Sequence, residues 1–258
     1  MTTDLEGADV LHPETPPRPD RWRTVAQTLG EILVTGGLVV LLFVVYELFI
    51  TDVITDQRQD ELSEQLHDGW DASPTVVPIH ESKLGDAFAV LHIPRLGADY
   101  ERVVLEGTEE RQLSQGPGHY IGTAMPGEQG NVSFAGHRVG KGSPFLDLDL
   151  LEPGDPIVVE TSDSWFVYRM LGDAATGDVA ADPSGIPGRQ IVRPEALDVI
   201  SPTPNGDDGA APTGAYLTLT TCHPKYSAEQ RMIVHARLDG GAISKADMPN
   251  GPAALQER

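Results

Sequence analysis

Cys222 is the only cysteine among 258 residues, and it ends the alternating stretch AYLTLTTC at residues 215–222. On a strand over these residues Cys222 shares a face with Thr220, while Thr221 points to the opposite face. Pro224 ends the strand's hydrogen bonding just beyond the thiol, so Cys222 is predicted at a strand end beside a loop. A thiolate is the reactive form of cysteine, and a nearby cation favours it. The position therefore allows nucleophilic chemistry, with an inert buried cysteine as the alternative.

Two other residues have the right chemistry to assist such a thiol. Arg231 begins the next apolar run, RMIVHARL, and an antiparallel strand there brings its guanidinium toward Cys222. A thiol nucleophile also needs a group that moves protons, usually a histidine. Of the eight histidines, His137 fits this role best because it ends the alternating run GNVSFAGH before a Gly-rich loop. His223 follows Cys222 directly, so in an extended backbone it points away from the thiol.

Short β-rich runs separated by Gly and Pro turns extend from about residue 86 to residue 239. The predicted strands are FAVLHI, ERVVLEG, GNVSFAGH, DPIVVET, WFVYRML, ALDVIS, AYLTLTT and RMIVHARL. Their length and spacing are typical of a small β-barrel or sandwich. One short helix is predicted over TEERQLSQG, ending near Gly116.

An apolar segment precedes this β-rich region. Residues 25–50 contain ILVTGGLVVLLFVVY, which carries no charge, and are long enough to cross a hydrocarbon core that needs ~20 residues. No small-residue cleavage site follows, so an uncleaved transmembrane anchor is favoured over a signal peptide. Three arginines lie at positions 18–23, whereas only Arg58 lies close after the span. Because Lys and Arg mark the cytoplasmic side, we expect a cytoplasmic N-terminus and a single-pass protein of the cell membrane with its β-domain outside.

The rest of the chain is assigned by composition. We expect a disordered cytoplasmic tail over residues 1–24, an extracellular stalk and linker over 51–85, the catalytic domain over 86–240, and a disordered C-terminal tail over 241–258. The formal charge of −21 argues against nucleic acid as a partner. An exported domain with one cysteine cannot form an internal disulfide. No HExxH or CxxC motif exists, and DLDL and GDDG are typical of solvated turns, so no metal or other cofactor is expected.

TLTTC, followed after eight residues by Arg231 and preceded by GNVSFAGHR, resembles the sortases, the membrane-anchored cysteine transpeptidases of Gram-positive bacteria. The resemblance covers roughly residues 86–238. GPGHYIGTAMPGEQGN and TCHPKYSAEQRMIVHA are most similar to class E, the actinobacterial housekeeping group. Membership implies an all-β fold, a closed eight-stranded barrel with one or two short helices. It also implies that Cys222 is the nucleophile, His137 the general acid and base, and Arg231 the donor that stabilises the oxyanion.

The same resemblance implies a substrate. Such enzymes cleave an LAxTG- or LPxTG-type sorting signal of exported proteins between Thr and Gly and join the protein to a peptidoglycan-precursor amine of the lipid II type. Tyr120 is expected near the signal's second position, where class E enzymes favour Ala, and Thr221 is expected to line the same groove. Pilus-polymerising sortases commonly have a D-P-aromatic lid and a second, C-terminal span. Neither is visible in this sequence, which favours cell-wall anchoring.

Other hypotheses stay open at this point. A catalytically silent, membrane-tethered β-domain that binds peptides or cell wall has the same composition, and a plain endopeptidase has the same catalytic residues. Papain-like proteases place their histidine after the cysteine, whereas His137 comes before Cys222. The cysteine L,D-transpeptidases carry an S-H-G-C type motif that this sequence lacks. The order and spacing therefore favour a sortase-like transpeptidase.

Overall fold

The computed structural model describes residues 21–46, 51–72, 82–207 and 209–257. The chain divides into two units, one ending at Val45 and one beginning at Tyr46. The first contains helix α1 (Arg21–Val45), which has no buried residue and is long and apolar enough to cross a membrane. Twenty-five residues give a helix of about 37 Å, more than the ~30 Å of a hydrocarbon core. The predicted anchor therefore coincides largely with a helix, although its residues 47–50 lie outside the described part. The predicted disordered tail is corrected at its end, since residues 21–24 belong to α1.

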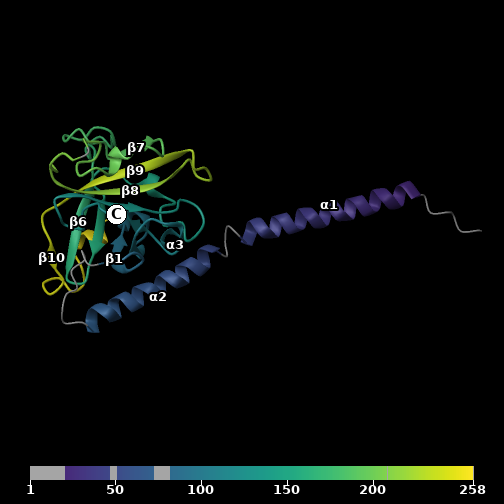
Figure 1. The fold of residues 1–258 in the computed structure, drawn as a ribbon, viewed down its shortest axis with the longest axis horizontal. Coiled ribbons are helices and arrows are strands. Elements are labelled where there is room, and N and C mark those ends of the chain that lie inside the picture. The colour runs from purple at the N-terminus through teal and green to yellow at the C-terminus, as the bar shows by residue number, and fades with distance from the viewer. Residues whose placement is uncertain (1–20, 47–50, 73–81, 208, 258) are drawn as a thin grey trace, which may run out of the picture. The chain divides into compact units, whose positions relative to one another are not determined.

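The second unit is built on one antiparallel-rich sheet (Figure 1). Within the described residues its strands are β1 (Ala87–His92), β2 (Glu101–Glu106), β3 (Gly118–His119), β4 (Gly130–Ala135), β5 (Pro156–Glu160), β6 (Ser164–Met170), β7 (Arg189–Val192), β8 (Ala215–His223), β9 (Gln230–Leu238) and β10 (Ile243–Ser244). Helical segments between and after them are α3 (Glu110–Leu113), η3 (Pro94–Leu96), η4 (Leu148–Leu150), η5 (Asp198–Ile200) and η6 (Ala253–Gln256).

The sheet closes on itself. Its order is β10-β6-β5-β1-β2-β3-β4-β8-β9-β7, and an additional pairing joins β6 to β9. Eight strands, from β6 through β5, β1, β2, β3, β4 and β8 to β9, thus form a ring, while β7 and β10 pair with ring strands from outside it. This confirms the predicted closed eight-stranded all-β barrel. The predicted short helix is also confirmed, as the single turn α3.

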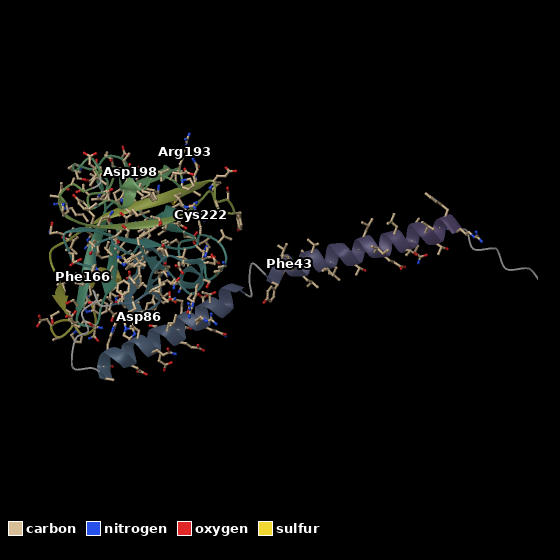
Figure 2. The ribbon with its side chains drawn as sticks, in the orientation of Figure 1. Phe43, Asp86, Phe166, Arg193, Asp198 and Cys222 are labelled. Carbon is tan, nitrogen blue, oxygen red and sulfur yellow. The ribbon has the colours of Figure 1, made fainter. Side chains whose placement is uncertain are left out.

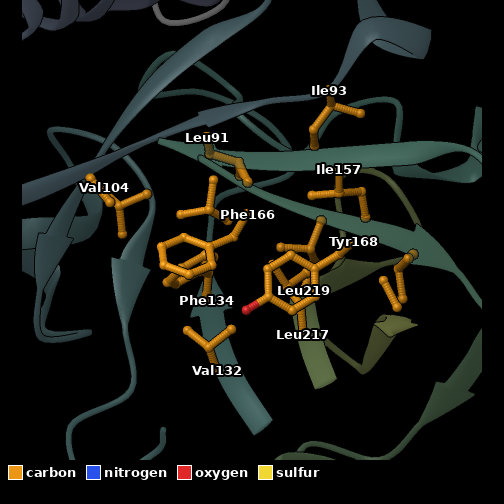
Figure 3. Packing of buried hydrophobic residues seen from close by; sticks show 14 of the residues in the cluster. Leu91, Ile93, Val104, Val132, Phe134, Ile157, Phe166, Tyr168, Leu217 and Leu219 are labelled. Carbon is orange, nitrogen blue, oxygen red and sulfur yellow. The ribbon is translucent and has the colours of Figure 1, made fainter. Parts of the chain in front are cut away.

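Apolar side chains at alternate positions of the strands fill the barrel interior. Leu217 and Leu219, two residues apart on β8, point inward and pack in one cluster with Leu91, Phe134 and Tyr168. Figure 3 shows these side chains converging between the strands. Burying one such side chain stabilises the fold by ~1.5–3 kcal/mol, which fixes which face of each strand is inside. The opposite face of β8, with Cys222 at its end, is therefore directed away from this cluster.

One predicted strand is wrong, and the short strands β3, β7 and β10 were not predicted. ALDVIS contains the 3₁₀ turn η5, because prolines flank it and the side chain of Asn131 donates to the carbonyls of Val199 and Ser201 at 3.2 and 3.0 Å. A buried side chain here satisfies backbone acceptors that a neighbouring strand would otherwise satisfy. Strand β7 was missed because RQIV is mostly half-buried and shows no apolar alternation.

The segment 51–85 was predicted to be a stalk and linker that stand apart from the domain. Its helix α2 (Thr51–Ala72) instead packs on the barrel. Gln59 is buried and bonded to β2, and His67 Nε2 lies 3.2 Å from the Glu160 carboxylate of β5. Thr55, Gln59 and His67 recur at multiples of four residues, which places them on one helix face. The contact between α2 and the barrel is made largely by polar side chains, so the sequence of the helix has no apolar stripe that would predict it. Residues 73–81 lie outside the described part.

The predicted disordered tail over 241–258 is also corrected, as far as residue 257. Ala254 of η6 packs with Trp165, Val158 and Val167, and the Trp165 indole donates to the carbonyl of Met248 at 3.1 Å. The segment is rich in small and polar residues, and a few of them anchor it to the outside of β5 and β6. The compact domain therefore extends beyond the predicted limits of 86 and 240 at both ends.

Candidate active site

Strands β8 and β9 bring the thiol and an arginine together. Cys222 and Arg231 are direct partners in the antiparallel register, so their side chains leave the sheet on the same face. Directly opposed residues of such a pair have Cβ atoms ~4.5–5.5 Å apart. Cys222 carries a free, partly exposed thiol at the end of its strand (Figure 2). The predicted antiparallel pairing of the strands that carry Cys222 and Arg231 is therefore confirmed.

Strand β4 brings His137 to the same place. β4 runs parallel to β8 with Ala135 paired to Thr220, and the Gly136 amide donates to the Thr220 carbonyl at 3.0 Å. His137 and Cys222 each lie two residues beyond the Ala135–Thr220 pair. Because both strands run in the same direction, their ends meet at one edge of the barrel. His137, Cys222 and Arg231 thus arrive at one edge of the barrel from three neighbouring strands.

The imidazole of His137 is in a setting that favours its neutral form. Its side chain is 24% exposed, and Nε2 is buried with no hydrogen-bond partner among the described residues. The nearest acidic oxygen recorded is Glu110 Oε2 at 3.9 Å, beyond hydrogen-bond range. Burial lowers the pKa of His137, since a charged imidazolium loses hydration there. A neutral imidazole can accept the proton of a thiol.

Arg231 is held by backbone carbonyls of its own hairpin. Its Nη1 donates to the carbonyl oxygens of Ala228 and Gln230, each at 3.0 Å. Both bonds originate from one nitrogen, and a guanidinium carries five N–H groups. These two bonds therefore use only part of the donor set of Arg231.

Tyr120 lies on the same side of the sheet as Cys222. Its hydroxyl shares a hydrogen bond of 2.9 Å with Thr220 Oγ1, and Thr220 has the same orientation on β8 as Cys222. The Tyr120 amide donates to the Ser133 carbonyl of β4 at 2.9 Å, which fixes the start of the loop that follows β3. The structure therefore places a phenol ring beside the strand that carries the thiol.

Thr221 lies on the other face. It is 2% exposed, and its hydroxyl donates to the carbonyl oxygen of Gly136 at 2.8 Å. This bond fixes the residue before His137 relative to the residue before Cys222. Of the five residues singled out by sequence, four gather on one face, and Thr221 supports them from behind.

Sequence reasoning missed Arg138. This side chain is only 4% exposed, and its Nη1 donates to His223 Nδ1 at 2.9 Å and to the Cys222 carbonyl at 3.4 Å. Its Nη2 donates to Asp149 Oδ1 at 2.9 Å, so one aspartate of the DLDL motif, interpreted above as a solvated turn, pairs with a buried arginine. Arg138 ties the residue after His137 to the backbone of Cys222. A signal existed in the sequence, since a charged residue directly followed the candidate histidine.

Comparison with known proteins decides the family. The model of the sortase domain matches residues 91–239, which include every residue of this site. The chain belongs to the sortase family. It is 37% identical over 220 residues to sortase SrtE1 of Streptomyces coelicolor, covering 83% of this chain and 57% of that protein. Sortases are cysteine transpeptidases, which agrees with a thiol, an imidazole and a guanidinium at one edge of a barrel.

Solved sortase structures resemble this one in fold. The SrtF sortase from Corynebacterium diphtheriae is 38% identical with a TM-score of 0.64, covering 72% of this chain and all of that one. Sortase E from Streptomyces avermitilis is 36% identical with a TM-score of 0.54, covering 67% of this chain and 99% of that one. The similarity to SrtE1 and to this sortase E places the chain with the class E sortases.

Proposed function

We propose that this protein is a membrane-anchored cysteine transpeptidase that attaches exported proteins to the cell wall. The observation that carries the proposal is the pairing of Cys222 with Arg231 across β8 and β9, with His137 at the adjacent end of β4. A thiol, an imidazole and a guanidinium on three neighbouring strands are the groups that acyl transfer through a thioester requires.

In the first half-reaction Cys222 Sγ attacks the Thr carbonyl carbon of a sorting signal of the LAxTG or LPxTG type. The thiol proton passes to His137, which then gives it to the Gly amine as the C–N bond breaks, and the protein's Thr is held as a thioester. The negative charge that develops on the carbonyl oxygen is bound by Arg231. Loss of one such donor typically costs ~100–1,000-fold in rate.

In the second half-reaction an amine replaces the leaving group. His137, now neutral, takes a proton from the incoming amine of a lipid II-type peptidoglycan precursor, whose nitrogen attacks the thioester carbon and releases the Cys222 thiolate. Water in place of the amine gives hydrolysis, the activity of an endopeptidase. Burial of His137 suits the base role, because its lowered pKa keeps the neutral form available at neutral pH.

The position in the cell forms part of the proposal. Helix α1 serves as an uncleaved anchor with a cytoplasmic N-terminus, so the barrel acts outside the membrane. Exported proteins that bear the signal near their C-terminus are the first substrate, and the precursor amine is the second. Tyr120 is proposed to contact the signal's second residue, and Thr221 to fix the strand ends behind the site.

The experiment is a transfer assay with the full chain in detergent. Donor peptides containing LAxTG or LPxTG are incubated with and without a peptidoglycan stem-peptide amine, and the products are separated by chromatography and weighed by mass spectrometry. The proposal predicts cleavage between Thr and Gly and a transfer product that forms at the expense of the hydrolysed peptide. Cleavage at another bond, or binding of both peptides without any cleavage, would contradict it and favour a silent binding domain.

A further inference from the structure

Part of the β2 edge that faces β3 has no strand partner among the described residues, and a side chain of helix α2 bonds to it. β3 has only two residues and pairs with Leu105 and Glu106 of β2, so Val103 has no strand partner on that side among the described residues. Gln59 of α2 takes that position. Its Oε1 accepts from the Val103 amide at 2.6 Å, and its Nε2 donates to the Gln115 carbonyl at 2.5 Å and the Val103 carbonyl at 3.4 Å. One carboxamide thus bonds the backbone groups that a longer β3 would bond.

The Gln59 side chain lies very close to the backbone at Gly116. Gln59 is 4% exposed, and a Cβ on Gly116 would lie 2.2 Å from its Nε2 and 2.8 Å from the Val103 carbonyl oxygen. Only glycine fits at position 116 with α2 in place. A buried carboxamide with all its bonds made is costly to remove, because the backbone groups it satisfies are left without partners.

One turn earlier, α2 reaches the loop that follows His137. Thr55 is buried, and a Cβ on Gly142 would lie 2.7 Å from its Cγ2. Gly142 has φ +76°, a conformation that glycine adopts without strain. The loop from His137 is short, since the Phe145 amide donates back to the His137 carbonyl at 3.1 Å. Thr55 therefore packs against a loop whose two ends are tied at the catalytic histidine.

The second bond of Gln59 leads to the other side of His137. Gln115 follows α3, and α3 begins with Glu110. The Glu110 carboxylate lies 3.9 Å from His137 Nε2 and forms an ion pair with Lys141, in the same loop that Thr55 contacts. Helix α2 thus contacts the loop after His137 through Thr55 and the segment that carries Glu110 through Gln59.

We propose that Gln59 and Thr55 are positioning residues that set the geometry of His137, and that α2 is a working part of the catalytic domain. This proposal rests on the proposed function. Without the two contacts, α3 and the loop 138–144 lose a shared support, and the imidazole loses its alignment with the thiol. A misplacement of ~1 Å of a catalytic group can cost ~100-fold in rate. The residues that face the sorting signal, such as Tyr120, are bonded to β4 and β8 and do not depend on α2.

The test compares Gln59→Leu with Gln65→Leu, a matched change at an exposed position on the same helix. In the transfer assay, Gln59→Leu is expected to lower kcat by ~10–100-fold with KM changed less than about threefold, since alignment and not binding is lost. Gln65→Leu is expected to match the wild type. Thr55→Ala is expected to lower kcat in the same direction by a smaller factor. If Gln59→Leu lowers only the melting temperature, or raises KM alone, α2 is a structural support and the proposal is wrong.

A second readout does not depend on activity. The imidazole ¹H–¹⁵N signals of His137, assigned by their loss in His137→Gln, are expected to shift in Gln59→Leu and to stay in place in Gln65→Leu. A Glu110→Gln background is expected to reduce the effect of Gln59→Leu on kcat, because the two changes act through one contact. Unmoved His137 signals in a folded Gln59→Leu variant overturn the positioning role. If the wild type transfers no peptide while the signals shift as expected, the proposed function fails and the link from α2 to His137 stands.

Discussion

Cys222 and Arg231 stand residue against residue in the β8–β9 register, and eight residues of chain separate them in the sequence. A pairing of this kind fixes both side chains by backbone hydrogen bonds, so neither depends on a flexible loop for its position. The guanidinium is further held by two carbonyls of its own hairpin. The backbones of Cys222 and Arg231 are therefore fixed by the β8–β9 hairpin.

Replacing Arg231 by Lys is expected to lower kcat/KM by ~100–1,000-fold, because an ammonium keeps the charge and loses the planar set of donors. The matched control is Arg237→Ala, an exposed arginine on the same strand, which is expected to leave the rate unchanged. Steady-state kinetics with an LAxTG peptide measure both. Similar rates for Arg231→Lys and wild type would remove Arg231 from the oxyanion role.

Tyr120→Phe and Thr220→Val each delete one side of the same hydrogen bond. Both are expected to change the preference for Ala over Pro at the signal's second position by a similar factor, within the ~1–3 kcal/mol that such pockets provide. The measurement is the ratio of kcat/KM for the two peptides. Equal losses for both peptides in either variant would make Tyr120 a structural residue.

Arg138→Met removes the link between the Cys222 carbonyl, His223 and Asp149. The free energy of unfolding is expected to fall by ~1–3 kcal/mol, since the Cys222 carbonyl, His223 and Asp149 lose their charged donor. We also expect kcat to fall, because the backbone of Cys222 is no longer tied to that of the histidine strand. Urea unfolding and kinetics measure the two effects, with the exposed Arg193→Met as control. A variant as stable and active as the control contradicts this role.

Stability is expected to fall as the pH drops from 7.5 to 5. Burial lowers the pKa of His235 to about 3, whereas an unfolded histidine titrates near 6.5. Below about pH 6.5 the unfolded chain therefore binds a proton at His235 that the folded chain does not bind. This difference lowers the free energy of unfolding by at most ~1.4 kcal/mol per pH unit. Glu160, with a pKa of about 2, adds its own loss only below its unfolded value near 4.5.

Guanidinium unfolding at several pH values measures this slope. His235→Gln is expected to be less stable at pH 7.5 and to show a flatter dependence between pH 7.5 and 5. An unchanged slope in the variant would show that another group causes the acid sensitivity. His137, whose pKa burial also lowers, contributes in the same direction and accounts for a residual slope.

The positions of His137 and Cys222 were predictable because they lie at the ends of alternating strands, where period-two patterning and a following proline or glycine mark the position. The contribution of α2 was not predictable in the same way. Its contacts are made by Thr55, Gln59 and His67, which are polar, so the helix reads as a solvated stalk. Whether a glutamine bonds water or a strand backbone depends on β3 being two residues long, and that is a property of the fold.

The C-terminal segment and Arg138 illustrate the same limit. Residues 241–257 fold against Trp165 through a few contacts, which small and polar residues do not signal. From the sequence Arg138 resembles a surface charge, because its partner Cys222 is 84 residues away and becomes a neighbour only through the pairing of β4 with β8. Long-range pairing determines the contacts of both, and local patterning does not identify those partners.

The central claim is that Cys222 carries the acyl group, and intact-mass spectrometry tests it most directly. The full-length protein is mixed with an LAxTG donor peptide without amine, quenched in acid and weighed. The account predicts a mass increase equal to the donor's segment ending at Thr, located on the fragment that contains Cys222, lost when amine is added, and absent in Cys222→Ala. Cleavage that continues in a folded Cys222→Ala variant, or an adduct on any other residue, would contradict it.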